Sequence, residues 1–462
     1  MAFRIRDPVH NFVVLPDDFE PLLNTRVLQR LRRIRQLAMA NLVYPGALHT
    51  RFEHTLGVTH VAGQMAHHLR IEGEDLRLVQ LAALLHDIGH GPFSHVSEIS
   101  LARFADQGTL SPEQKGEKIH ELVTANIIEN NEELLGILDG YPVENIVTLL
   151  GKGTDRRILK QVVSGPLDAD KQDYLLRDSQ FCGVQYGTFD LHQMQRSLVA
   201  VGADTEEELM ITQHGVHAVE QYVLAKYYMT ANVYRHRVRL ITDAMIGRAI
   251  RLGIESDRLE QLDRLYRFNN TDDFVSNYLE WDDARFLETF CPLHQSAPGE
   301  KSGALLRRLR ERRLLKQVYT EEIDTLDARI RETVKSLAKT EKDRARTLIE
   351  ERVAEFVSRE LGGSVDPDFV IVHAYDIKSA RETSSNDDEG ILVQGSPTPR
   401  AFIEVSTLFK SINAAYTDKW VEVYAPIAWG DRNQRDELRG RWKEPIKGII
   451  TDVCLAERRI GP

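Results

Sequence analysis

Cysteine is scarce in this chain of 462 residues, and its three cysteines, Cys182, Cys291 and Cys454, lie far apart. Because no Cys-x-x-Cys pair is present, the sequence excludes a disulfide framework and a thiolate zinc site and favours a reducing compartment. No apolar run approaches the roughly 18 residues that cross a bilayer, and residues 1–8 lack the apolar core of a secretory signal. We therefore expect a cytoplasmic protein with no membrane partner.

An excess of basic residues is also missing. The net charge of −11 disfavours broad, non-specific binding to nucleic acid. Two local basic runs, at 30–35 and 307–313, leave two interpretations open. Each run is either a solvated helix face or a binding site for a compact polyanion such as a nucleoside triphosphate, so nucleic acid is only a weak candidate partner.

Apolar periodicity predicts a mainly α-helical protein with a small C-terminal α+β lobe. We place a catalytic core at 1–300, a helical arm or connector at 301–364 and the α+β lobe at 365–462, with a mobile acidic loop at 384–389. Exposed arms at 305–361 make a homodimer or homotetramer plausible. The expected helices are 52–69, 75–88, 117–130, 169–177, 216–248 and 406–416, and the expected strands are 369–372, 391–393, 401–405 and 420–424.

Histidine is concentrated in one segment, since residues 49–95 hold half of the sixteen histidines. Histidine and carboxylate at this density are costly in a plain apolar core. His54, the doublet His86-Asp87 and the distant Asp170 follow the order H…HD…D, which supplies mixed nitrogen and oxygen ligands. A single histidine is more often a hydrogen-bonded helix residue, but the set of four favours a divalent metal centre that acts on phosphate. Iron, manganese or zinc suits these ligands, and a carboxylate can also reach a second ion, magnesium.

Further candidates for phosphate chemistry lie beside these four residues. His90 follows His86 by one turn if the helix continues, His95 follows a Gly-Pro turn, and His120 lies in the next helical region. A histidine can protonate a leaving oxygen or hold phosphate as imidazolium. Arg51 and Lys171 can supply fixed positive charge, although each is otherwise an ordinary surface charge.

Several runs together resemble the HD-domain phosphohydrolases. Among these the chain is most similar to the dNTP triphosphohydrolases of the SAM-and-HD-domain type, in particular to bacterial relatives that lack the SAM domain. The matching runs are DPVHN at 7–11, LQRLRRIRQL at 28–37, PGALHTRFEHTLGV at 45–58, LLHDIGHGPFSH at 84–95, DADKQDYLLRD at 168–178, YGTFD at 186–190 and VYRHRV at 233–238. The resemblance implies an HD-domain helical core and hydrolysis of a dNTP to deoxynucleoside and inorganic triphosphate.

The resemblance also implies roles for individual residues. His54, His86, Asp87 and Asp170 would hold the metal, and His95 would protonate the departing 5′ oxygen. The remaining residues are implied as phosphate ligands (Arg51, His90, His120, Lys171 and Lys226), as sugar readers (Gln36, Tyr174 and Asp178) and as side chains that crowd the 2′ position (Leu37 and Tyr234). His49, His60, His67 and His68 would take neither role.

Three positions bear on regulation and geometry. Gln29 and Arg32 match part of a nucleotide effector site of some relatives, but Asn24 stands where an aspartate would read guanine. Glu98 replaces the aspartate that often follows the last histidine of the loop, and it is a candidate support for His95. Two alternative functions remain: an HD phosphodiesterase or nuclease acting on oligonucleotides or cyclic nucleotides, and a nucleotide-sensing or nucleic-acid-binding protein.

Overall fold

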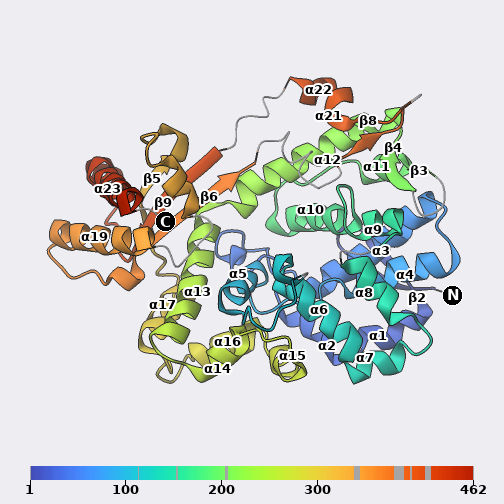
Figure 1. Ribbon diagram of the computed structural model, residues 1–462, viewed down its shortest axis with the longest axis horizontal. Coiled ribbons are helices and arrows are strands. Elements are labelled where there is room, and N and C mark those ends of the chain that lie inside the picture. Colours follow the sequence, from blue (N-terminus) through green and yellow to red (C-terminus); the bar gives the residue numbers. More distant parts are fainter. Residues whose placement is uncertain are drawn as a thin grey trace. The chain divides into compact units, whose positions relative to one another are not determined.

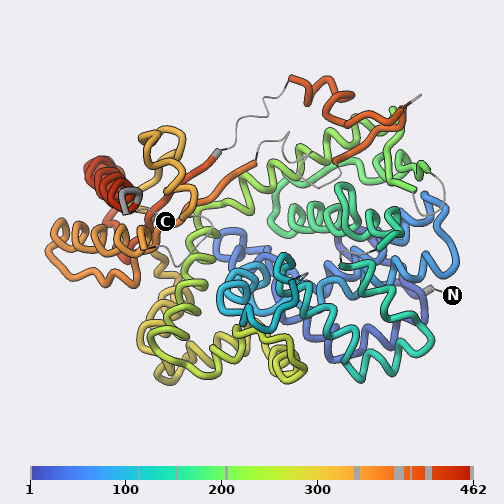
Figure 2. Tube along the Cα trace, in the orientation of Figure 1, coloured from blue at the N-terminus to red at the C-terminus, as the bar shows by residue number. Residues whose placement is uncertain are grey.

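A computed structural model gives the fold of the chain, which is mainly helical, as predicted (Figure 1). The residues that it describes, coloured in Figure 2, are 2–112, 114–151, 154–202, 207–337, 344–378, 390–395, 398–411 and 418–460. The chain forms two compact units. The first unit comprises Met1–Tyr234, Glu260–Thr289 and Ala380–Ala414, and the second comprises Arg235–Leu259, Phe290–Ser379 and Ala415–Pro462.

The first unit consists of helices around a β-hairpin and a small sheet. Its strands are β1 Ala2–Asp7 and β2 Asn11–Pro16, which form the hairpin, and β3 Leu198–Val201, β4 Glu208–Ile211, β7 Leu392–Val393 and β8 Arg400–Ala401, which form a sheet in the order β3-β4-β7-β8. Its helices are α1 Glu20–Leu23, α2 Arg26–Arg30, α3 Arg51–His68, α4 Gly73–Leu85, α5 His95–Phe104, α6 Ile119–Asn130, α7 Glu132–Ile137, α8 Val143–Leu150, α9 Arg157–Val163, α10 Ala169–Cys182, α11 Leu191–Arg196, α12 Val216–Met229, α14 Glu260–Tyr266, α15 Asp272–Leu279, α16 Asp283–Phe290, α21 Phe402–Val405 and α22 Thr407–Lys410.

Three helices of this unit, α3, α4 and α10, carry the residues of interest. Helix α3 packs against both α4 and α10. Its first turn has a capping box, in which Thr50 precedes the helix and the Glu53 carboxylate accepts a hydrogen bond from the Thr50 amide at 2.7 Å. Asp168 caps the start of helix α10, where its carboxylate accepts from the Lys171 amide at 2.7 Å, and Gly183, with φ 69°, caps its end. Both helix starts are therefore fixed by their own sequence.

Helix α4 ends at Leu85, earlier than the predicted 75–88, and a loop follows. Phe93 and Ser94 have positive φ values of 62° and 53°, which a helix cannot accommodate. The loop is fixed from outside, because the Asp283 carboxylate accepts from the Phe93 amide at 2.8 Å and Arg30 donates to the His90 carbonyl at 2.8 Å. Arg30 is buried, so the start of the basic run 30–35 is neither a solvated face nor a polyanion site.

The second unit contains a three-stranded antiparallel sheet in the order β5-β9-β6. Its elements are α13 Arg237–Glu255, α17 Glu300–Arg310, β5 Lys316–Glu322, α18 Arg331–Ser336, α19 Arg344–Leu361, β6 Ile371–Ile377, β9 Asp418–Ala425 and α23 Arg432–Ile460. The core between sheet and helices includes Val353, Val372, Val423 and Trp442, all fully buried.

Several predictions about the C-terminal third differ from the structure. Because β5 pairs with β9, the segment 301–364 is not a purely helical connector but part of the second unit. Residues 402–405 are helix α21, not strand, although their β-branched and aromatic side chains favoured a strand. The predicted strand 391–393 exists, but it joins the sheet of the first unit.

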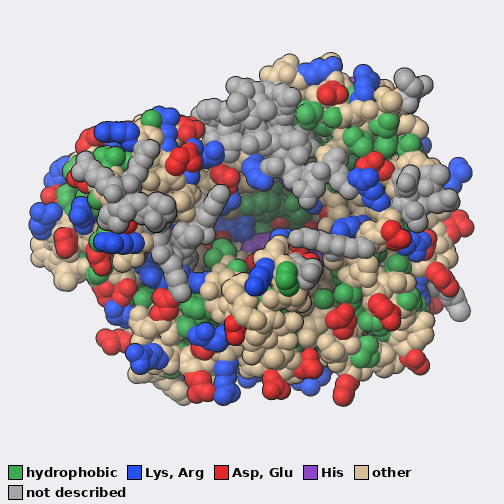
Figure 3. Space-filling model, in the orientation of Figure 1, with side chains coloured by type: hydrophobic (Ala, Val, Ile, Leu, Met, Phe, Trp, Pro, Cys, Tyr) green, Lys and Arg blue, Asp and Glu red, His purple; other side chains and the backbone are tan. Residues whose placement is uncertain are grey.

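The remaining predictions concern two segments that the structure does not describe and the absence of a membrane-spanning helix. The loop 384–389 and the end of the predicted helix, residues 412–416, lie outside the described residues. Within the described ranges, no helix combines the length and the apolar character needed to cross a bilayer. On the face shown in Figure 3, basic and acidic side chains are interspersed over the described surface.

Candidate metal centre

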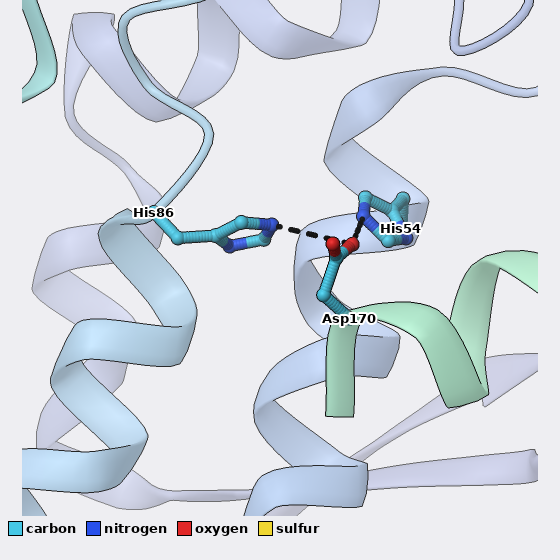
Figure 4. Close-up of side chains that lie close together, drawn as sticks. All are labelled: His54, His86 and Asp170. Atoms are coloured by element: carbon cyan, nitrogen blue, oxygen red, sulfur yellow. Dashed lines mark ion pairs between the residues drawn. The ribbon is translucent and has the colours of Figure 1, made fainter. Parts of the chain in front are cut away.

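Three elements of the first unit bring His54, His86 and Asp170 together (Figure 4). His54 comes from the first turn of α3, His86 directly follows α4, and Asp170 lies in the first turn of α10. One ligand atom from each lies within 4.8 Å of the others. Asp170 Oδ1 is 3.0 Å from His54 Nε2 and 3.8 Å from His86 Nε2.

The outer nitrogens of both histidine rings are held by acceptors. His86 Nδ1 lies 2.8 Å from the Ala83 carbonyl oxygen, and His54 Nδ1 lies 2.9 Å from Asp173 Oδ2. Since a carbonyl or carboxylate oxygen only accepts, each Nδ1 carries a proton and donates it. His86 Nε2 is buried and forms no hydrogen bond within the described part of the chain. A buried lone pair facing a carboxylate fits a divalent cation.

Asp87 lies at the edge of this group. Its Oδ1 is 3.4 Å from His86 Nε2, and its Oδ2 is 3.8 Å from His54 Nε2 and 2.5 Å from Arg51 Nη1. Burial alone would raise the pKa of Asp87, but the charges of Arg51 and His86 hold it well below its usual value. The carboxylate is therefore an anion that can join the metal ligands while Arg51 neutralises part of its charge.

The group is electrostatically coupled even without a cation. Burial alone would lower the pKa of His54, but hydrogen bonds to Asp170 and Asp173 raise it to about 10. Burial alone would raise the pKa of Asp170, but its contact with the His54 ring and the charges of His54 and His86 lower it. Positive charge is thus favoured between these side chains, and a divalent ion would supply it in the place of protons.

The other histidines of the predicted set surround the centre on one side. The His90 ring stacks on His120 at 4.0 Å between centroids and meets the exposed His95 ring edge-on at 5.7 Å. His90 is not on the helix of His86, because α4 has ended. Burial and the charge of Arg51 hold the pKa of His90 well below its usual value, so we expect a neutral ring, not an imidazolium.

Glu98, the predicted support of His95, contacts His120. Glu98 Oε2 lies 2.8 Å from His120 Nδ1, and its carboxylate also accepts from the backbone amides of Ile119 and His120. Glu98 therefore fixes the start of α6 and the orientation of His120.

The two predicted cations differ in their surroundings. Arg51 is buried, donates to Ser94 Oγ at 2.8 Å, and has a buried Nη2 that forms no hydrogen bond within the described residues. Lys171 Nζ lies 2.7 Å from Asp168 Oδ2 and 2.9 Å from the Gly165 carbonyl oxygen. Arg51 is thus placed to offer a donor near the centre, whereas Lys171 is already bound to the start of its own helix.

A second cluster lies further along α10. The buried Asp178 carboxylate accepts from Tyr234 Oη at 2.7 Å and lies 2.7 Å from His49 Nε2. Tyr174 meets the Tyr234 ring edge-on at 6.2 Å. We expected no role for His49, but its ring is fully buried, stacks on Phe181 and fixes Asp178.

The other predicted substrate residues lie in the same unit. Gln36 is buried, and its Oε1 forms no hydrogen bond within the described residues. Leu37 is buried beside it in sequence, and Lys226 is half-buried on α12.

The candidate effector residues border a cavity of about 370 Å³. Asn24, Gln29 and Arg32 line it together with Phe52 and Asp7. Arg32 Nε donates to Gln29 Oε1 at 2.9 Å, and its guanidinium lies 3.7 Å from the Phe52 ring centroid.

Four residues behind His54 have no predicted role: Asp7, His10, Asp173 and Arg177. Asp173 contacts His54 directly. His10 and Arg177 form hydrogen bonds with Asp173, and Arg177 also donates to Asp7. The signal was present, because Asp173 and Arg177 are spaced i, i+4 on a predicted helix and the run DPVHN had no assigned role.

Comparison with known proteins agrees with this geometry. The HD-domain family model matches residues 51–177, and the model of the HD-associated region matches residues 193–436. The chain is 35% identical over 255 residues to the uncharacterized protein YwfO of Bacillus subtilis, which is 53% of this chain and 54% of that protein. It is 29% identical over 349 residues to the human deoxynucleoside triphosphate triphosphohydrolase SAMHD1, which is 68% of this chain and 54% of that protein.

Among solved structures, a hypothetical protein from Aquifex aeolicus has a TM-score of 0.69 at 26% identity, covering 96% of this chain and all of that one. The chain spans about half the length of the curated relatives it matches. The fold and the cluster of His54, His86 and Asp170 together define an HD-type domain with a candidate divalent-metal centre. The chain belongs to the family of HD-domain proteins with an HD-associated region.

Proposed function

We propose that this protein is a deoxynucleoside triphosphate triphosphohydrolase, which converts a dNTP and water to deoxynucleoside and inorganic triphosphate. The observation that carries the proposal is helix α10, which presents Asp170 at the metal centre and Asp178 two turns later. At about 1.5 Å per residue these two carboxylates are separated by about 12 Å along the helix axis. A nucleotide with its α-phosphate at the first would place its sugar toward the second.

We assign the selection of deoxyribose to the second cluster, which contains Asp178, Tyr174 and Tyr234. Asp178, Tyr174 and Gln36 offer acceptors and donors to the 3′ hydroxyl, and a substrate lacking that hydroxyl would leave buried polar groups unpaired. Leu37 and Tyr234 add bulk near the sugar, which disfavours a 2′ hydroxyl. The name of human SAMHD1, a dNTP triphosphohydrolase, supports this choice of substrate.

The chain's own residues divide the chemistry. His54, His86, Asp87 and Asp170 would hold a divalent ion, which would supply Lewis acidity and activate water for attack on the α-phosphorus. Arg51 offers its free Nη2 donor to a phosphate oxygen, where it offsets charge that develops in the transition state. The exposed His95 ring, in edge contact with His90, donates a proton to the departing 5′ oxygen.

One assay tests the proposal against its alternatives. The purified chain is incubated with Mn²⁺ and, separately, with each dNTP, each NTP and single-stranded DNA, and triphosphate, nucleoside and DNA length are measured. We expect equal amounts of triphosphate and deoxynucleoside from dNTPs. Shortened DNA without any triphosphate would instead identify a nuclease.

We also propose that a nucleotide effector occupies the cavity lined by Asn24, Gln29 and Arg32. Its volume of about 370 Å³ and its arginine suit a nucleotide with a phosphate group. With GTP or dATP added as probe, the parent should show a higher initial rate, and Arg32→Ala should lose that increase while keeping the rate without effector. An unchanged response of Arg32→Ala to both nucleotides would contradict this assignment.

A further inference from the structure

A buried, charged cluster lies on the side of His54 away from Asp170. Asp173 is fully buried, and each of its oxygens has two partners. Oδ2 lies 2.9 Å from His54 Nδ1 and accepts from Arg177 Nε at 2.8 Å, while Oδ1 lies 2.7 Å from His10 Nε2 and accepts from Arg177 Nη2 at 2.9 Å. The carboxylate is thus fixed in position and rotation by four hydrogen bonds.

The N-terminal hairpin completes this cluster. Arg177 is fully buried and donates from Nη1 to Asp7 Oδ2 at 2.8 Å. Asp7 is the last residue of β1, and its Oδ1 accepts from the backbone amides of Val9 and His10. The turn between β1 and β2 therefore places one carboxylate on Arg177 and one imidazole on Asp173, which gives the run DPVHN a physical role.

The close approach of two helices maintains the same contact. A Cβ atom at Gly57, one turn after His54 on α3, would overlap the Asp173 carboxylate and the Arg177 guanidinium. Glycine at this position therefore allows the carboxylate of α10 to reach the ring on α3.

We propose that Asp173 is a positioning residue for the metal ligand His54, and that Arg177, Asp7 and His10 hold Asp173 in place. By accepting a hydrogen bond from Nδ1–H, the carboxylate fixes the tautomer and the ring orientation, so that Nε2 faces Asp170 and the site that a cation would occupy. A buried charge network of this kind is expensive unless every group is paired, and here the groups are paired with one another. The proposal rests on the metal centre of the proposed function and not on the substrate.

The test is direct titration of the metal-free full chain with Mn²⁺, followed by calorimetry, in the parent and in Asp173→Asn. The amide preserves the shape of the side chain but removes its charge and turns an NH₂ group toward existing donors. We expect Mn²⁺ affinity to fall about 10- to 100-fold, as is typical when the partner of a ligating histidine is lost. Affinity equal to that of the parent would overturn the proposal.

A matched control separates positioning from general damage. Asp282 is also a buried aspartate paired with an arginine, since it lies 2.5 Å from Arg33 Nε, but it belongs to no metal group. Asp282→Asn should bind Mn²⁺ like the parent. Equal losses in Asp173→Asn and Asp282→Asn would show a non-specific effect and count against the proposal.

Two further variants keep the test decisive if Asp173→Asn does not fold. Arg177→Lys and His10→Asn leave the carboxylate in place but each removes a group that fixes it. We expect both to bind Mn²⁺ several-fold more weakly than the parent, and unchanged affinity in both would overturn the proposal. Failure of the proposed function is distinguishable, because it would appear as absence of triphosphate release with normal Mn²⁺ affinity.

Discussion

The side chains at the two ends of helix α10 lie in different chemical environments. At its first turns, Asp170 and Asp173 lie in a network of charges, where each side chain has two or more oppositely charged or donor partners. Two turns later, Asp178 contacts a phenol and an imidazole, and Tyr174 contributes a ring. In the proposed function, the first end would depend on charge and on exact placement of metal ligands, and the second would depend on hydrogen bonds that a sugar can share. Substitutions should therefore affect metal affinity at one end and substrate selection at the other.

The largest effect is expected for His86→Ala combined with Asp87→Ala. This variant removes two of the four proposed metal ligands, so triphosphate release should fall to background, because metal assistance contributes several kcal/mol to transition-state stabilisation. Mn²⁺ titration and product analysis check it, with circular dichroism as the control for folding. A double variant with full activity would show that the metal site is elsewhere.

The next largest effect is a loss of stability that should differ between two glycines of helix α3. Gly57→Ala places a Cβ against the Asp173 carboxylate and Arg177, and overpacking of this kind costs about 1–3 kcal/mol of unfolding free energy. At Gly63 the nearest atom is the amide end of the flexible Gln80 side chain, so Gly63→Ala should lose little or gain from helix propensity. Urea unfolding of both variants, with Mn²⁺ titration, measures the difference. Similar stabilities would mean that the Asp173 contact is not rigid.

At the other end of α10, Asp178→Asn should leave Mn²⁺ affinity unchanged. Loss of a charged hydrogen-bond acceptor for the sugar costs about 1.5–3 kcal/mol, which lowers kcat/KM for dNTPs by about 10- to 100-fold. Parallel measurement of metal binding and kinetics separates the two ends of the helix. A large loss of metal affinity in this variant would show that the two ends of the helix do not act independently.

Tyr234→Phe should have the smallest effect. It removes only the hydroxyl that donates to the Asp178 carboxylate, and because this bond positions Asp178 without touching the sugar, only part of its about 1.5–3 kcal/mol affects catalysis. We expect kcat/KM for dNTPs to fall less than about tenfold, because the ring that crowds the sugar remains. Competition between dNTP and NTP measures this, and a variant that accepts both equally would show that the hydroxyl, and not the ring, sets the selection.

The sequence allowed prediction of the helical core, because α3, α4 and α10 carry strong periodicity and local start signals. The order of His54, His86, Asp87 and Asp170 along the chain also predicted a metal centre, and the structure brings His54, His86 and Asp170 together. By contrast, residues 402–405 were assigned as strand, because short apolar segments fit a strand or a helix until their neighbours are known. The pairing of β5 with β9 was equally hidden, because those strands are distant in sequence.

The amino-acid sequence by itself determined the types and order of the groups that can bind metal and phosphate, because ligand chemistry belongs to the residues. Only the tertiary structure decided which groups support them. In the structure, Asp7 and His10 of the N-terminal hairpin contact Arg177 and Asp173, respectively. Glu98 contacts His120, and His49 contacts Asp178. These contacts span up to 170 residues, and local patterning carries no information about pairs brought together only by the packing of whole helices.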